Sequence, residues 1–391
     1  MGTLTTTGRT RSMGALFAGV ALLNTATVGL STAATLIVAA GSGPGWSGLP
    51  SVASVLGTAA GALGAGLLLP GLGRRRVLVS GYGVAVLGAL TAFAAALATS
   101  VLPLLLGILL VGVGNGGAQL SRYLAADLYP AERRGRALAT VVWAGTVGAL
   151  AGPALMAPAA HVVTGFGWPS LSGPVAVAVL ATAGAALAAA LLPRDVPPPP
   201  EPVVVARGPV RSAAVARPLV AMVAAQLTMV AVMTMTPLQL QSHGHGLEVV
   251  GWVLSAHMIG MFALAPLSGR IADRWGPRVT VNAGLGVLAL ATATAIAAPT
   301  AHTSGLPVAL FLLGYGWNLV FVGGSAQLSR DLAPETRRRA QGFADAVVWS
   351  ASALAALGSG QLFAGGGYAL VAVVGGILAM LPLALLAPRK S

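Results

Sequence analysis

Residues 118–122 read Ala-Gln-Leu-Ser-Arg, and residues 326–330 read Ala-Gln-Leu-Ser-Arg again. Each copy is followed by an aspartate, a proline, a glutamate and a group of arginines. Each group then leads into an apolar run that contains Val-Val-Trp, with Trp143 in the first half and Trp349 in the second. A long-range motif pair of this kind predicts that the second half of the chain repeats the fold of the first half.

The rest of the chain is built from apolar runs. Of its 391 residues, 56% are hydrophobic and only 8% are charged. An apolar run of about 20 residues is long enough to cross a bilayer as a helix. The sequence predicts twelve such helices, at residues 14–40, 49–69, 77–98, 101–122, 137–160, 172–192, 218–241, 248–268, 279–298, 306–330, 342–363 and 368–387. The predicted fold is therefore an all-α membrane protein.

Twelve helices in two similar sets predict two pseudo-symmetric six-helix bundles around a central cavity. The first bundle takes residues 1–192 and the second takes residues 218–391. Residues 193–217 lie between them and contain four consecutive prolines, which favour a stiff, extended linker. This linker is too short to form a domain of its own.

The positive charges predict the orientation of these helices. If both termini are cytoplasmic, all 22 Lys and Arg residues fall in the tails and inner loops, as the positive-inside rule requires. The net charge of +13 then concerns topology and anionic lipid head groups rather than nucleic acid. The chain has no cysteine, which excludes disulfides and thiolate metal sites.

One inner loop carries a recognisable signature. Residues 269–278 read Gly-Arg-Ile-Ala-Asp-Arg-Trp-Gly-Pro-Arg, which resembles the loop motif G-x-L-A-D-R-x-G-R-R of the major facilitator superfamily. The copy in the first half begins at Gly66 and has Pro70 where the acidic residue belongs. With the twelve spans and the two halves, the resemblance covers the whole chain. It implies transport by alternating access.

The same resemblance implies a conformational latch on the cytoplasmic side. In the family, the acidic residue of this loop helps to hold the two halves together, and Asp273 can take that role whereas Pro70 cannot. The candidate latch residues are Gly269, Asp273, Arg274, Gly276, Arg330 and Asp345. The alternative is that both loops serve topology and folding alone.

Methionines gather in one predicted hairpin of the second half. Six of the ten methionines fall in residues 222–261, where two apolar runs are joined by a short polar turn. Met229 and Met233 are four residues apart on the first helix, and His257 and Met261 are four apart on the second. Because the two helices run antiparallel, we expect Met233 to lie near the depth of His257, and Met229 near that of Met261.

Three thioethers and one imidazole suit a soft metal ion. Thioether sulfur is polarisable and neutral, and it binds Cu(I) far better than Mg²⁺, Ca²⁺ or Mn²⁺. Neutral imidazole is also a copper ligand. Weak thioether binding allows an ion to be released, as passage requires. The alternatives are that methionine fills irregular gaps between helices, and that His257 is a packing residue or a proton-linked group.

The two motifs extend the resemblance. M-x-x-x-M followed by H-x-x-x-M looks like the CcoA-type copper importers of the major facilitator superfamily, in which both motifs supply copper ligands. The resemblance implies that Met229, Met233, His257 and Met261 are the metal-binding residues here. Riboflavin transporters related to these importers share the motifs, so the motifs alone do not name the cargo.

Other polar and aromatic residues are candidates for binding an organic substrate. They are Asn24, Asn115, Gln119, Trp143, Asn318 and Trp349. The two tryptophans occupy matched positions in the two halves and would favour a flat ligand such as a flavin or a drug. Hydrogen bonding between helices is the alternative role for the amides.

The sequence therefore predicts a secondary active transporter, a symporter or a uniporter, of the inner or plasma membrane. The expected cargo is copper moving inward, with a riboflavin-type molecule or an exported drug as the alternative cargo and a non-transporting sensor as a third reading. We expect a monomer in the lipid bilayer, no resident cofactor and no nucleic-acid partner. We expect no enzyme activity, because no nucleophile–base set, open zinc site or phosphate loop is present.

Overall fold

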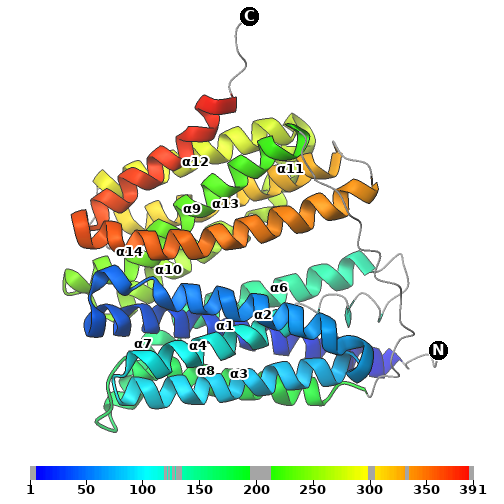
Figure 1. Ribbon diagram of the computed structural model, residues 1–391, viewed down its shortest axis with the longest axis vertical. Coiled ribbons are helices and arrows are strands. Elements are labelled where there is room, and N and C mark those ends of the chain that lie inside the picture. The colour runs from blue at the N-terminus through cyan, green and yellow to red at the C-terminus, as the bar shows by residue number, and fades with distance from the viewer. Residues whose placement is uncertain are drawn as a thin grey trace, which may run out of the picture. The chain divides into compact units, whose positions relative to one another are not determined.

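The computed structural model describes residues 6–118, 121, 124–125, 128, 134–193, 213–297, 304–330 and 334–386. Within these residues every regular element is a helix (Figure 1). Up to residue 190 these are α1 (Thr6–Ser42), the 3₁₀ helix η1 (Pro44–Trp46), α2 (Leu49–Leu72), α3 (Arg74–Leu97), α4 (Val101–Ala118), α6 (Arg134–Ala154), α7 (Met156–Thr164) and α8 (Ser172–Ala190). From residue 213 they are α9 (Ala213–Ser242), α10 (Leu247–Phe262), α11 (Ala265–Trp275), α12 (Pro277–Ala297), α13 (Gly305–Arg330) and α14 (Pro334–Leu386).

The chain divides into two compact units. The first contains Met1–Gly41 and Leu49–Pro202, and the second contains Ser42–Gly48 and Val203–Ser391. The segment Ser42–Gly48 groups with the second unit although the helices on either side of it, α1 and α2, belong to the first. Most of the predicted linker, residues 194–212, lies outside the described residues.

In the first unit, α4 packs against both α2 and α3, and α3 also packs against α8. Glycines allow these helices to approach closely. A Cβ atom on Gly57 would meet the carbonyl oxygen of Leu109, and one on Gly88 would meet that of Gly107 at 2.6 Å. The hydrophobic effect does not bring helices together in a bilayer, because lipid tails are as apolar as the side chains. Close packing of this kind holds them together instead.

The second unit repeats this arrangement. Helix α13 packs against α10 and α12, and α9 packs against α14 and α13. Glycines again lie where these helices are in contact. A Cβ atom on Gly260 of α10 would meet the carbonyl oxygen of Phe311, and one on Gly284 of α12 would meet that of Gly316 at 2.8 Å. Glycines therefore allow close contact between α4 and both α2 and α3 in the first unit, and between α13 and both α10 and α12 in the second.

Several helices are interrupted. Within the described residues ten helices are long and apolar enough to cross a membrane, or eleven if the pair Trp143–Ala154 and Met156–Thr164, bent by 43°, forms one span. Helix α14 has non-helical backbone at Gly366 and Gly367, where the φ of Gly367 is 65°, so it consists of two arms. The predicted number of twelve requires the bent pair to be one span and the arms of α14 to be two.

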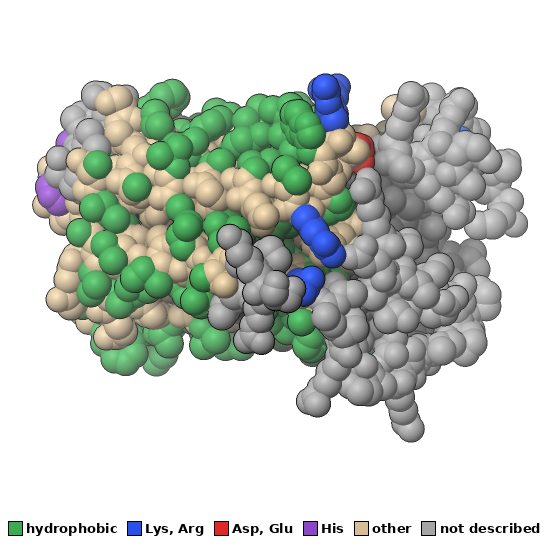
Figure 2. Space-filling model, turned by 90° about the horizontal axis from the view of Figure 1, so that it is seen from above, with side chains coloured by type: hydrophobic (Ala, Val, Ile, Leu, Met, Phe, Trp, Pro, Cys, Tyr) green, Lys and Arg blue, Asp and Glu red, His purple; other side chains and the backbone are tan. Residues whose placement is uncertain are grey.

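The described surface suits a lipid environment. Large apolar side chains project from the helices, with exposed fractions that reach 83% at Leu67 and 79% at Leu102. On the face shown in Figure 2, hydrophobic side chains are spread over the described surface, whereas Lys and Arg side chains are confined to one end and His to the opposite end. This separation agrees with an apolar band between two polar ends.

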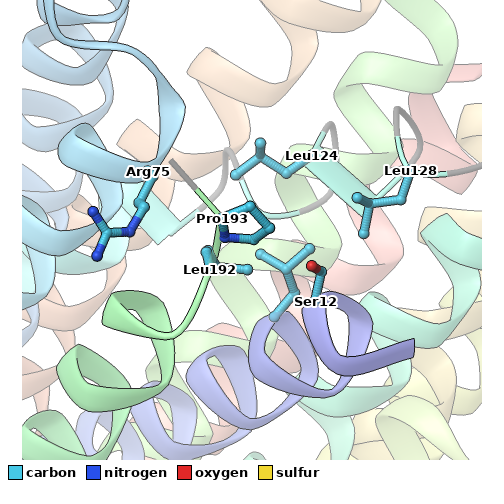
Figure 3. A pocket seen from close by; sticks show the side chains of 7 residues that line it. Ser12, Arg75, Leu124, Leu128, Leu192 and Pro193 are labelled. Atoms are coloured by element: carbon cyan, nitrogen blue, oxygen red, sulfur yellow. The ribbon is translucent and has the colours of Figure 1, made fainter. Parts of the chain in front are cut away.

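A small cavity of about 80 Å³ lies in the first unit (Figure 3). Four leucines, Pro193, Ser12 and Arg75 line it. The guanidinium of Arg75 donates a hydrogen bond of 2.8 Å to the carbonyl oxygen of Ala190 in the last turn of α8, where basic residues stabilise free carbonyls. Arg75 belongs to the first-half copy of the loop signature, so at least one arginine of that copy has a structural role.

Candidate functional site

The predicted methionine hairpin is formed by α9 and α10. The turn between them contains Gly244, which has a φ of 79° that suits glycine. Helices α9 and α10 contact each other little, and both pack against α13. The centre of the site is therefore α13, which lies against both arms of the hairpin.

The four predicted metal ligands lie inside the second unit. His257 is completely buried, Met229 is 5% exposed and Met261 is 9% exposed. Met233 is half-buried. The side chains of three of the four are thus shielded from lipid. That Met229 and Met233 meet His257 and Met261 around one ion stays a prediction.

His257 is held by α13 through one ring nitrogen only. Its Nδ1 lies 2.9 Å from the carbonyl oxygen of Leu310. Because a carbonyl can only accept a hydrogen bond, Nδ1 carries the proton and Nε2 of the neutral ring has a lone pair. Among the described residues, Nε2 is buried and has no hydrogen-bond partner. Histidines that bind metals usually donate their second N–H to a carbonyl or carboxylate in this way.

Met261 lies one turn further along α10 and also faces α13. Its Cγ would be 3.1 Å from a Cβ atom on Gly314, which would also overlap the carbonyl oxygen of His257, so a larger residue there would push α10 away from α13. Its carbonyl oxygen accepts a hydrogen bond of 2.7 Å from Nδ2 of Asn318. His257 and Met261 therefore share the face of α10 that packs on α13.

A polar network that the sequence analysis did not identify joins three helices of the second unit. Gln226 of α9 donates to Oγ of Ser352 on α14 at 2.6 Å and accepts from the indole N–H of Trp317 on α13 at 2.6 Å. Trp317 stacks on Phe321 with ring centroids 4.9 Å apart. A glutamine in the middle of an apolar span, one turn before Met229, was the signal in the sequence.

The residues proposed to bind an organic substrate lie in varied environments. Asn24 donates to the carbonyl of Val20 in its own helix at 3.0 Å, and Asn115 is half-buried. Trp143 and Trp349 are 65% and 58% exposed. Gln119 lies outside the described residues.

Asn318 differs from these because it is only 5% exposed. Its Oδ1 accepts a hydrogen bond from Ser268, and its Nδ2 donates to Met261. These hydrogen bonds join α13 to α10 and α11, and substrate binding by Asn318 stays a prediction.

The loop signature covers the end of α11, the turn at Gly276 and the first residues of α12. Gly276 has a φ of 89°, and the matching Gly73 of the first half has a φ of 75°. Asp273 and Arg274 are exposed, and the guanidinium of Arg274 lies 5.4 Å from the ring centroid of Trp275. The side chains of Arg330 and Asp345 lie outside the described part of the chain. The latch therefore stays a prediction.

Comparison with known proteins identifies the class. The family model of the Major Facilitator Superfamily matches residues 14–356, and again residues 219–391, and the chain belongs to this superfamily of membrane transporters. A D-xylose–proton symporter of known structure has the same fold, with a TM-score of 0.72 at 15% identity over 95% of this chain and 97% of the symporter. The relatives and structural neighbours are transporters rather than enzymes.

Two relatives match very different shares of this chain. The uncharacterized MFS-type transporter YdeG of Bacillus subtilis is 31% identical over 95% of this chain and 88% of its own length. The riboflavin transporter RfnT of Brucella anthropi is 30% identical over 138 residues, which are 35% of this chain and 34% of RfnT. The chain is thus a multi-pass transporter, and its bacterial relatives suggest a plasma membrane.

Proposed function

We propose that the protein is a secondary active transporter that carries Cu(I) into the cell by alternating access. The observation that supports this cargo most directly is Nε2 of His257, which has a lone pair in a fully buried position and no hydrogen-bond partner in the described part of the chain. A neutral nitrogen ligand beside neutral thioethers binds a soft monovalent cation without requiring a buried negative charge.

In this proposal the four side chains act as two successive sites. Met233 and His257 bind the ion first, and Met229 and Met261 receive it as the two bundles rock around the site. The bond from Nδ1 to the Leu310 carbonyl keeps the ring oriented throughout. Because His257 is completely buried, the helices around it must separate before an ion can reach Nε2.

Side-by-side uptake tests this function. Purified protein in proteoliposomes should accumulate copper, supplied as Cu(I) under reducing conditions, and should leave riboflavin outside. Liposomes without protein measure leakage of both solutes. Accumulation of riboflavin without copper would overturn the copper proposal, and binding of either solute without movement across the bilayer would favour a membrane sensor.

A second candidate cargo is a flat organic molecule of the riboflavin type or an exported drug. The partial similarity to RfnT favours it. So does the stacked pair of Trp317 and Phe321, both half-buried, since aromatic faces stack on planar ligands. The Gln226 amide orients the indole of Trp317 and would fix the plane of this platform.

If the organic cargo is the true one, replacing Trp317 with Ala will reduce riboflavin uptake about fivefold or more, because one aromatic stacking contact contributes roughly 1 kcal/mol. Trp252→Ala is the matched control, because Trp252 is 58% exposed on α10. Initial uptake rates of labelled riboflavin measure the effect. Equal rates for the Trp317→Ala and unmodified proteins would remove this platform from the path of the cargo.

We also propose the finer topology that the sequence predicts. Twelve spans put both termini on the same side of the membrane, and that side is the cytoplasm because only then do all the positively charged residues lie inside. Asp273 and Arg274, at the end of α11, would lie on that side, and Asp273 would serve as the single acidic latch, since Pro70 stands at the matching position of the first half. We propose a monomer, because each copy of the fold carries its own pair of bundles.

A further inference from the structure

The span that carries His257 and Met261 is broken. Leu247–Trp275 is apolar enough to be one membrane span, yet it consists of α10 and α11 with Ala263 and Leu264 between them. Pro266 explains the break, because it has no N–H to donate to the carbonyl of Phe262 one turn earlier. The break separates the proposed cargo ligands from Asp273, which lies near the end of α11.

Asn318 of α13 bridges this break. Its Nδ2 donates to the carbonyl oxygen of Met261, in the last turn before the break, at 2.7 Å. Its Oδ1 accepts from the hydroxyl of Ser268, beyond the break, at 2.5 Å. Ser268 is completely buried. Because Ser268 donates to the oxygen of the amide, the nitrogen of the amide must face Met261.

The contact with Asn318 is the last of a regular series. Leu310, Gly314 and Asn318 follow one another at intervals of four residues and lie on one face of α13. Leu310 accepts from the ring of His257, and Gly314 allows Met261 to approach. His257 is thus anchored by its own side chain, whereas the backbone of Met261 is anchored by Asn318.

We propose that Asn318 is a positioning residue that clamps both arms of the broken span and thereby fixes the place of the Met261 thioether. Ser268 orients the amide of Asn318 and does not touch the cargo. The effect on cargo binding rests on the proposed copper function, but the clamp itself does not. The clamp predicts a signal at position 261 that is independent of any cargo.

Cysteine labelling measures that signal, because the chain has no cysteine of its own. In the Met261→Cys protein, labelling by N-ethylmaleimide should be slow, since Met261 is 9% exposed. Adding Asn318→Ala should raise the labelling rate about three- to tenfold, the range expected when the Met261 carbonyl loses its buried hydrogen bond to Nδ2. Asn282→Ala, at an exposed position on α12, is the matched control and should leave the rate unchanged.

Ser268→Ala gives a second test that leaves Asn318 in place. It should raise the labelling rate at position 261 by a smaller factor, because the amide loses its orientation and keeps its donor. Equal labelling rates with and without both substitutions would overturn the clamp. Elution of each variant as a monodisperse peak in detergent shows that the change is local.

Copper affinity separates the clamp from the cargo proposal. Asn318→Ala should weaken Cu(I) binding about three- to tenfold, and should have no further effect in a Met261→Leu background. In a His257→Ala background it should keep its full effect. The same loss in both backgrounds would show a general structural role and overturn the clamp. If Met261→Leu alone leaves Cu(I) binding unchanged while the labelling result holds, the copper function fails and the clamp stands.

Discussion

Copper accumulation will fall at least about tenfold when His257 is replaced by Asn, because the substitution removes the Nε2 lone pair of a ring that the Leu310 carbonyl holds in one orientation. The Asn amide reaches the place of Nδ1 and can still donate to the Leu310 carbonyl. It has no atom at the place of Nε2. The substitution therefore removes the ligand and retains the anchor to α13. Cell-associated copper in a host without its own importer measures the effect.

Met233→Leu tests the sulfur in the same assay. Leucine has nearly the volume of methionine and costs less than about 1.5 kcal/mol in a packed core, but it has no thioether. We expect Met233→Leu to lower copper accumulation about tenfold. Met156→Leu is the control, because Met156 is completely buried in α7 of the first unit. If both variants accumulate copper as the unmodified protein does, methionine only fills space at position 233.

The membrane fold could be predicted from the sequence because a bilayer permits few kinds of backbone structure. A chain with 8% charged residues and repeated apolar runs must satisfy its backbone in helices. The repeat of Ala-Gln-Leu-Ser-Arg at residues 118–122 and 326–330 then indicated two halves, and family comparison confirmed the superfamily. The interruption at Gly366 and Gly367 was also visible as a run of glycines from residue 365.

The contacts of the site could not be predicted in the same way. A helix that is apolar all round does not show which face meets its neighbours, so the rotation of α10 against α13 had to come from the structure. The hydrogen bonds of Gln226 to Trp317 and Ser352 join residues far apart in the chain. The grouping of Ser42–Gly48 with the second unit likewise depends on packing, which local sequence does not specify.

Gly260→Ala will destabilise the second unit by about 1–3 kcal/mol, the usual cost of overpacking. A Cβ atom at position 260 would overlap the carbonyl oxygen of Phe311 and would lie 3.1 Å from the backbone nitrogen of Tyr315. Both obstacles are backbone atoms of α13, so no flexible side chain can move aside. The helices must separate instead, which also lengthens the bond from His257 to Leu310.

Gly286→Ala is the matched control for this prediction. Gly286 lies on the exposed face of α12, and a Cβ atom there would have nothing within 4 Å. Alanine is the better helix former, so this substitution should leave stability equal or slightly higher. Unfolding midpoints in detergent compare the two variants, and equal midpoints would show that α10 and α13 are not closely packed. Because lipid is as apolar as leucine, the helices of this unit depend on close approach at residues such as Gly260 to associate. Gly260→Ala should therefore reduce the stability of the second unit and disturb the orientation of the His257 ring at the same time.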